Sequence, residues 1–283
     1  MGGYFPWVER YVHAKSINEA VSILNEAGGA AAVVAGGTSV SMRLPARVKT
    51  LMDLNGLGLD RITRLKTGVE IGAMVSLRSL ETVLADNWGG VIAEACQNVG
   101  TRLVRNAATI GGEMAAGLPW CDLPVVMAAL NADVMIAGRD QAIPAVQWTL
   151  DRPADILKNT IITGLNIPKR KAGQGLGFYK VTRVHGEYGA AVAGAWVEIN
   201  DNRIIACRVV AGSVSPHPVE LDYVEDAIIG RDVNGLDIDT AIEPIEQRFN
   251  PAGDPRFSKE YRRDMMRVAV RRALLQAMAQ GGE

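Results

Sequence analysis

The stretch VVAGGTSV at residues 33–40 joins an apolar run to two glycines and then to two hydroxyl residues. Glycine takes up positive φ angles readily and lets a backbone approach a ligand closely. Successive amides in such a turn converge on an anion, and the hydroxyls of Thr38 and Ser39 add donors. A second stretch, TIGGE at residues 109–113, repeats the glycine pair farther along the chain. Two neutral, donor-rich turns favour a diphosphate ligand, although each turn is also typical of a plain tight loop.

Other nucleotide-binding patterns do not account for these glycines. The chain contains neither GxxxxGK[ST] nor GxGxxG. The run GQGLG at residues 173–177 comes before a predicted strand, not between a strand and a helix, and is interpreted as a linker. The residues alone therefore predict an anion-binding site at one or both glycine pairs and go no further.

Composition narrows the class of protein. The chain has 283 residues, 48% of them hydrophobic and 22% charged, and a net charge of −1. This balance is that of a folded protein of two or three subdomains, without the field that draws a protein onto nucleic acid or an anionic membrane. The start of the chain shows no secretory pattern and no window reads as a membrane span, so a cytoplasmic location is expected.

The number and spacing of the cysteines and histidines limit which metal sites this chain could form. Three cysteines and three histidines are scattered without CxxC or HExxH spacing. They cannot supply the four thiolates of an iron–sulfur cluster, and they indicate no disulfide framework or metal site. Any redox chemistry in this chain requires an organic cofactor.

The pattern of apolar residues predicts an α+β fold throughout, in three parts: residues 1–56, 57–172 and 173–283. Ser16 and Glu19 form a capping box at the start of the first helix. Asp122 is expected to cap a helix that continues to Leu130. The last part is expected to hold a three-stranded sheet followed by helices. The predicted strands are 31–34, 51–54, 68–73, 134–136, 161–167, 176–182, 190–199 and 203–210, and the later helices are 219–229, 239–249 and 258–279.

The two glycine motifs also resemble a known family. VAGGTS at residues 34–39, and RNAATIGG at 105–112 followed by DLP at 122–124, look like the paired signatures of the FAD subunit of molybdenum hydroxylases. This family includes the carbon monoxide dehydrogenase medium subunit and the flavin domain of xanthine dehydrogenase. YKVTR at 179–183, AGSVSP at 211–216 and Ser258-x-x-Tyr261-Arg262 are similar to its C-terminal flavoprotein domain. The resemblance covers nearly the whole chain.

The resemblance implies a fold and a set of binding residues. The fold is a two-part FAD-binding module of the PCMH type, followed by a domain with an antiparallel sheet plus helices. Both glycine segments would clasp the FAD diphosphate, Asp122 would contact the polar middle of the cofactor, and Ile162 and Lys180 would line the flavin. Each of these three residues also has a purely structural interpretation. Asp122 could be only a helix cap, Ile162 only a strand core residue, and Lys180 only a solvated side chain. The implied cofactor-binding residues are Val34, Ala35, Gly36, Gly37, Thr38, Ser39, Thr109, Ile110, Gly111, Gly112, Glu113, Asp122, Ile162 and Lys180.

The chain departs from the family at several positions. Ser39 stands where relatives often have an acidic residue, and Glu113 stands where Asn or Asp is common. Residues 117–121 and 186–189 also differ from the usual pattern. The closing helix carries Arg262, Arg263, Arg267, Arg271 and Arg272, which are interpreted as a solvated face, with a docking face for an acidic partner as the alternative.

The resemblance also implies a division of labour. A large partner would carry the molybdenum cofactor and a small partner the iron–sulfur clusters, as a dimer of heterotrimers; FAD in this chain would pass the electrons to an external acceptor. No catalytic acid or base and no metal ligand is assigned to this chain. Two other classes stay open: a self-sufficient FAD-dependent oxidoreductase and a non-catalytic nucleotide-binding assembly protein.

Overall fold

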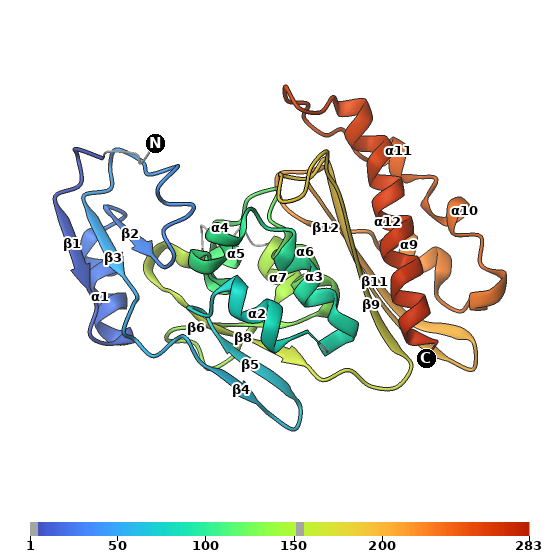
Figure 1. The fold of residues 1–283 in the computed structure, drawn as a ribbon, viewed down its shortest axis with the longest axis horizontal. Helices are drawn as coiled ribbons and strands as arrows, with labels where there is room; N and C mark the ends of the chain where they lie inside the picture. Colours follow the sequence, from blue (N-terminus) through green and yellow to red (C-terminus); the bar gives the residue numbers. More distant parts are fainter. Residues whose placement is uncertain (1–4, 86, 151–155, 283) are drawn as a thin grey trace.

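Three β-sheets follow one another along the chain in a computed structural model, which describes residues 5–85, 87–150 and 156–282. The strand orders are β1-β3-β2, β4-β5-β8-β6-β7 and β12-β11-β10-β9. Figure 1 shows the three sheets with their helices as three groups in a row, in the order of the sequence. The predicted α+β class is confirmed.

The first group is a small parallel sheet with one helix. It contains β1 (Arg10–His13), α1 (Ile17–Ala27), β2 (Ala31–Val34) and β3 (Thr50–Asp53). β3 lies in the middle and pairs in parallel with both neighbours. The predicted capping box forms in part. Ser16 Oγ accepts from the Glu19 amide at 3.1 Å, but the Glu19 carboxylate accepts from the Lys15 amide at 2.7 Å and not from that of the N-cap Ser16. β1 was not predicted, because it is a largely exposed strand without an apolar alternation.

The second group places helices against a mixed sheet. Its strands are β4 (Ile62–Arg64), β5 (Gly68–Gly72), β6 (Asp133–Ile136), β7 (Ile143–Pro144) and β8 (Ile162–Pro168), and β8 returns between β5 and β6. Its helices are α2 (Leu77–Val83), η1 (Asn87–Gly90), α3 (Val91–Gln97), α4 (Arg102–Ala107), α5 (Ile110–Ala116), α6 (Asp122–Leu130), α7 (Ala145–Leu150) and η2 (Leu157–Asn159).

Two predictions about this group were wrong. Gly111 and Gly112 lie in the first turn of α5 and not in a loop. Asp122 is the first residue of α6 and not its N-cap, which is Cys121 without a side-chain capping bond. All nine residues of α6 are buried, because this helix packs between the second group and strands β10 and β11 of the third.

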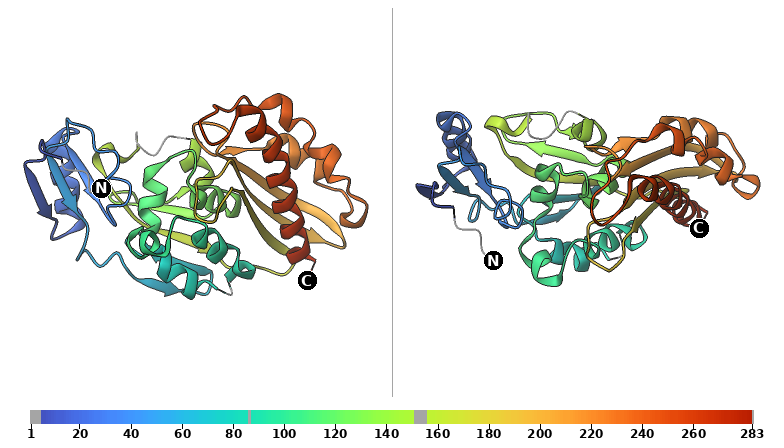
Figure 2. Two further views of the ribbon diagram at one scale, coloured as in Figure 1. Left: turned by 45° about the horizontal axis from the view of Figure 1, so that its top comes forward. Right: turned by 90° about the horizontal axis from the view of Figure 1, so that it is seen from above.

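The third group is an antiparallel sheet covered by helices, as predicted. It contains β9 (Gln174–Val181), β10 (Ala191–Asn200), β11 (Arg203–Gly212) and β12 (Val219–Glu220), followed by α9 (Asp222–Ile228), η3 (Val233–Gly235), α10 (Ile238–Ile242), α11 (Ile245–Arg248) and α12 (Lys259–Gly281). The sheet has a fourth short strand, β12, where a helix was expected. α12 lies across β9 and β10, and Figure 2 shows it along one face of the sheet.

The GQGLG run is part of this packing and not a linker. Gly175 and Gly177 lie in β9, where a Cβ atom would come within 1.9 Å of the carbonyl oxygens of Ala277 and Ala273 respectively. Glycine is therefore required for the close approach of α12 to β9.

The arginines of α12 do not form one solvated face. Arg262 is buried, and its guanidinium donates to the carbonyl oxygens of Gly189 and Ala190 and to the Asp254 carboxylate. Arg267 and Arg271 pair with carboxylates on α11 and α10. The solvated-face interpretation is therefore wrong for Arg262, which fixes α12 to the sheet.

Among the described residues, no helix is long and apolar enough to cross a membrane.

Candidate cofactor site between the first two groups

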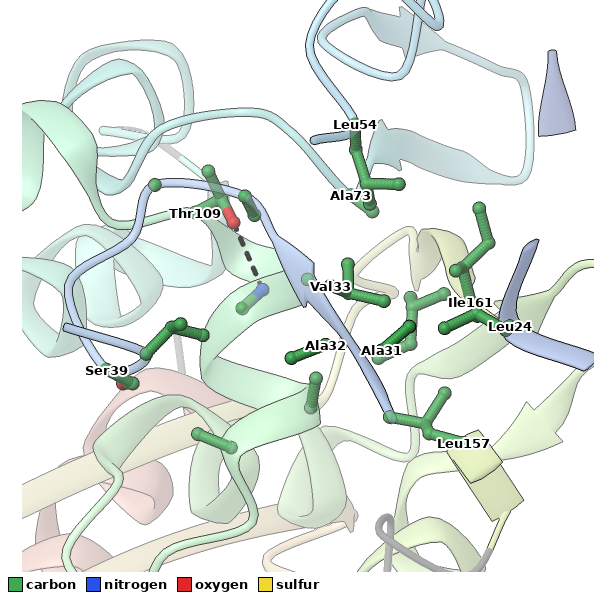
Figure 3. Close-up of a pocket in the computed structure, with 18 of the residues that line it drawn as sticks. Leu24, Ala31, Ala32, Val33, Ser39, Leu54, Ala73, Thr109, Leu157 and Ile161 are labelled. Carbon is green, nitrogen blue, oxygen red and sulfur yellow. Dashed lines mark hydrogen bonds between the residues drawn. The ribbon is translucent and has the colours of Figure 1, made fainter. Parts of the chain in front are cut away.

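A cavity of about 740 Å³ lies between the first and second groups. β2 and the loop after it form one wall, and α5, the start of β8 and residues 157–161 form others. In Figure 3 the labelled side chains divide across β2, with Ser39 and Thr109 to one side and Leu24, Leu157 and Ile161 to the other. The cavity thus has a polar part and an apolar part.

The first glycine segment presents free amides to this cavity. β2 ends at Val34, and the loop after it turns through Gly37, whose φ is +71°. The turn bonds of this loop use the carbonyls of Gly37 and Ser39, which accept from Ser41 and Met42. Within the described part of the chain, no hydrogen bond is formed by the amides of Gly36, Gly37, Thr38 and Ser39. Such a run of unpaired amides at a cavity wall is suited to an anion.

Gly36 is also required by packing. A Cβ atom on Gly36 would lie 1.7 Å from the carbonyl oxygen of Ala107, at the end of α4. α4 itself is fixed by Arg105, which pairs with the buried Glu81 and donates to the carbonyl of Gly100 at 2.9 Å. The arginine of the RNAATIGG motif therefore has a structural place behind the cavity.

In the second glycine segment, the amides from Ile110 to Glu113 are already hydrogen-bonded within the protein. The amides of Ile110 and Gly111 donate to the carbonyls of Val75 and Ala73, at 3.0 and 2.9 Å. The Gly112 amide donates to Thr109 Oγ1 at 3.1 Å, the contact drawn in Figure 3. Among the described residues, the glycine amides of the first segment are therefore unpaired, whereas those of Gly111 and Gly112 are engaged. In the second, the absence of side chains lets α5 lie against Ala73, whose Cβ would be 2.6 Å from a Cβ on Gly111.

The cavity wall also carries two basic residues that were not among the predicted binding residues. Arg47 and Lys158 line the cavity. Arg47 follows the first glycine segment closely in sequence, which is the one signal that pointed to it. The other unpredicted lining residues are mostly small or apolar, and they include Gly28, Gly29, Ala31, Ala32, Val33, Val40, Met74, Ala115 and Ala116.

Glu113 is the acidic residue of the wall. It lines the cavity and takes a hydrogen bond from the Cys121 thiol. Its pKa is raised to about 7, first by burial and then by the Asp122 carboxylate, while the Cys121 hydrogen bond and Lys180 oppose the rise. This carboxyl group therefore titrates close to neutral pH.

Asp122 and Lys180 form a buried ion pair outside the cavity lining. Lys180 Nζ lies 2.6 Å from Asp122 Oδ2 and 2.9 Å from the carbonyl oxygen of Asn98, with 3% of the lysine side chain exposed. Burial raises the pKa of Asp122 to about 6, against the opposing effect of Lys180. The solvated-lysine interpretation is wrong. The pair joins β9 to α6 behind α5.

The predicted site residues thus fall into three sets. Val34 and Ile110 neighbour the wall in sequence without lining it, and Asp122 and Lys180 lie behind it. Ile162 lines the cavity and also belongs to the main core. The predicted residues that line the cavity are Ala35, Gly36, Gly37, Thr38, Ser39, Thr109, Gly111, Gly112, Glu113 and Ile162.

These features fit a dinucleotide cofactor such as FAD. The volume lies in the range of cofactor pockets, the free amides suit a diphosphate, and the apolar part suits rings. Among the described residues, no group of three or more His, Cys, Asp or Glu side chains is placed to bind a metal ion.

Fold and cavity together define a two-part cofactor-binding protein with a separate C-terminal domain. Residues 7–170 match the family described as the FAD binding domain in molybdopterin dehydrogenase. Residues 177–277 match the CO dehydrogenase flavoprotein C-terminal domain. The chain belongs to this family, which confirms the resemblance inferred from the glycine motifs, and it is a FAD-binding medium subunit of the molybdenum hydroxylase type.

Individual relatives are similar over nearly their full length. The chain is 29% identical to the carbon monoxide dehydrogenase medium chain of Afipia carboxidovorans, covering 95% of this chain and 96% of the relative. It is 28% identical to the glyceraldehyde dehydrogenase medium chain of Sulfolobus acidocaldarius, covering 93% and 96%. Among solved structures, carbon monoxide dehydrogenase from Hydrogenophaga pseudoflava matches with a TM-score of 0.89, at 26% identity and 99% coverage of both chains.

Proposed function

We propose that this chain is the electron-transfer subunit of a multi-subunit molybdenum hydroxylase and that it holds FAD in the cavity between its first two groups. A small partner subunit carries 2Fe–2S clusters, and a large partner subunit carries the molybdenum cofactor and oxidises the organic substrate. The names of two relatives, both medium chains of dehydrogenases, support an assembly of unequal chains. The assembly we propose is a cytoplasmic dimer of heterotrimers.

The observation that carries the proposal is the row of unpaired amides from Gly36 to Ser39 at the cavity wall. These amides bind the FAD diphosphate, and the hydroxyls of Thr38 and Ser39 add donors. Arg47 and Lys158, which also line the cavity, lower the cost of bringing a dianion into it. Ile162 and the small apolar residues of β2 exclude water from the rings.

The remaining predicted residues contribute by shaping or supporting the cavity wall. Bound FAD supplies a centre that accepts and releases electrons, chemistry that no side chain provides. Thr109, Gly111 and Gly112 shape the surface that the cofactor contacts, with Val34 and Ile110 holding the two segments in place. Asp122 and Lys180 support α5 from behind.

The direct test is an absorption spectrum of the full chain, before and after dithionite, with the released cofactor identified. We expect a flavin spectrum that bleaches on reduction, with FAD as the released compound. A folded, colourless chain that FAD does not reconstitute would contradict the proposal.

A second measurement addresses the assembly. The chain is expressed with the products of neighbouring genes and purified through a tag on this chain alone. We expect two further polypeptides, one with iron–sulfur and one with molybdenum absorption. Purification of a flavin-loaded chain alone, active on a small substrate, would favour a self-sufficient oxidoreductase instead.

A further inference from the structure

Glu113, the acidic residue of the cavity wall, lies near a second carboxylate and has no cation partner among the described residues. It lines the cavity in the first turns of α5, next to the glycines that the proposed cofactor contacts. Asp122 lies behind it with a buried carboxylate whose Oδ1 has no hydrogen-bond partner. Lys180, the cation whose charge acts on Glu113, already donates hydrogen bonds to the Asp122 carboxylate and to the carbonyl oxygen of Asn98. No arginine or lysine of the described residues is within ion-pair distance of Glu113.

Lys180 therefore pairs with Asp122 and leaves the Glu113 carboxyl group without a cation partner among the described residues. A diphosphate in this cavity would add negative charge to the same enclosed space that Glu113 lines, and charges interact strongly where water is excluded. Protonation of Glu113 removes this repulsion and turns its carboxyl group into a hydrogen-bond donor.

We propose that Glu113 takes up a proton when the FAD diphosphate binds in this cavity, so that the affinity for FAD falls as the pH rises through neutrality. This inference rests on the proposed function, because it needs FAD as the occupant. It concerns a residue in which this chain departs from the Asn or Asp that is common in the family.

The direction in which the FAD affinity changes with pH follows from the charges around Glu113. The free chain has a Glu113 pKa of about 7, and a neighbouring dianion raises that pKa in the complex. The complex then binds more protons than the free chain between the two pKa values, and its affinity decreases with pH across that window. Below the window, Glu113 is protonated in both states and affinity is highest; above the window, affinity levels off at its minimum.

The other groups around Glu113 do not produce the same effect. Burial raises the pKa values of the Cys121 and Cys96 thiols, which stay protonated through the window. Asp122, with a pKa of about 6, titrates lower and is paired with Lys180. Arg47 and Lys158 face the cavity from its other walls.

The test is a titration of the flavin-free full chain with FAD at about pH 6, 7 and 8. For a pKa that rises by one unit on binding, Kd increases about fivefold from pH 6 to pH 8, and for a larger rise it increases up to about tenfold. Calorimetry in two buffers of different ionisation enthalpy counts the protons directly, and about half a proton per FAD is expected near pH 7. Glu113→Gln should remove both the slope and the proton uptake and keep the affinity that the wild type has at low pH.

A matched control comes from the third group. Glu225 also has a pKa raised to about 7, mainly by burial, but it lies on α9 and accepts from the Val209 amide away from the cavity. Glu225→Gln should leave the slope unchanged. A wild-type slope retained in Glu113→Gln, a slope that follows Asp122→Asn instead, or binding without proton uptake overturns the assignment of Glu113. Absence of FAD binding at every pH overturns the proposed function itself.

Discussion

Gly36–Gly37 and Gly111–Gly112 border the same cavity from two different groups of the fold, yet their backbones are used in different ways. The amides of the first pair form no hydrogen bond within the described residues, whereas those of the second donate to Ala73 and Thr109. The first pair is a binding surface and the second a packing surface. Similar glycine motifs in one site can therefore serve ligand binding and helix placement separately, and substitutions should separate the two roles.

The largest effect is expected at Gly36, which combines both roles. In Gly36→Ala, the new Cβ meets the Ala107 carbonyl oxygen at 1.7 Å, and backbone cannot move aside as a side chain can. We expect a loss of at least about 3 kcal/mol of unfolding free energy, together with loss of FAD. Urea unfolding and the flavin-to-protein ratio measure the two effects. Gly235→Ala, where the Cβ meets nothing within 4 Å, is the control and should change neither.

Gly111→Ala tests the packing role alone. Its Cβ would lie 2.6 Å from Ala73 Cβ and 2.7 Å from Ala73 O, so we expect a loss of about 2 kcal/mol. The affinity of the folded fraction for FAD should fall less than in Gly36→Ala. Adding Ala73→Gly removes one of the two contacts and should restore part of the stability. A double variant no more stable than Gly111→Ala would show that the contact with Ala73 is not the cause.

The local signals of this sequence were enough for most of the fold. The cap at Ser16 depends on neighbouring residues only. The same holds for the turn at residues 200–202 between β10 and β11, where Asp201 and Asn202 have positive φ. The cavity was likewise predictable in outline, because a glycine pair after an apolar strand marks a close backbone approach. β1 and β12 were missed because an exposed strand and a two-residue strand carry too little apolar pattern.

The parts of the site that escaped prediction depend on contacts between distant residues. Whether the amides of Gly111 and Gly112 are free is decided by Ala73 and by the cap at Thr109, and nothing in TIGGE itself reveals it. The burial of Lys180 is likewise decided by Asp122, which lies 58 positions earlier. A motif therefore located the site correctly in outline without showing which backbone groups are available to a ligand.

Gly37→Ala tests the binding role with little packing cost. The nearest atom to its Cβ is 4.0 Å away, but its φ of +71° is unfavourable for alanine. We expect a loss of about 1 kcal/mol of stability and a larger relative loss of FAD affinity, because the strain shifts the free amides of the loop. FAD titration alongside thermal unfolding would show this, and an affinity equal to that of the wild type would remove the loop from the binding surface.

The smallest effects on stability are expected at two threonines, one in each glycine segment, and they distinguish the packing role from the binding role most clearly. Thr109 Oγ1 caps α5 by accepting from the Gly112 amide, so Thr109→Ala should cost about 1 kcal/mol of stability. No hydrogen bond of the Thr38 hydroxyl to a described residue is found, so Thr38→Ala should change stability by less than about 0.5 kcal/mol and weaken FAD binding through the loss of a donor. Unfolding and FAD titration of both variants form a crossed pair. If Thr38→Ala lowered stability and left FAD affinity intact, the assignment of binding to the first segment and packing to the second would be reversed, because the roles would no longer follow from which groups are already hydrogen-bonded.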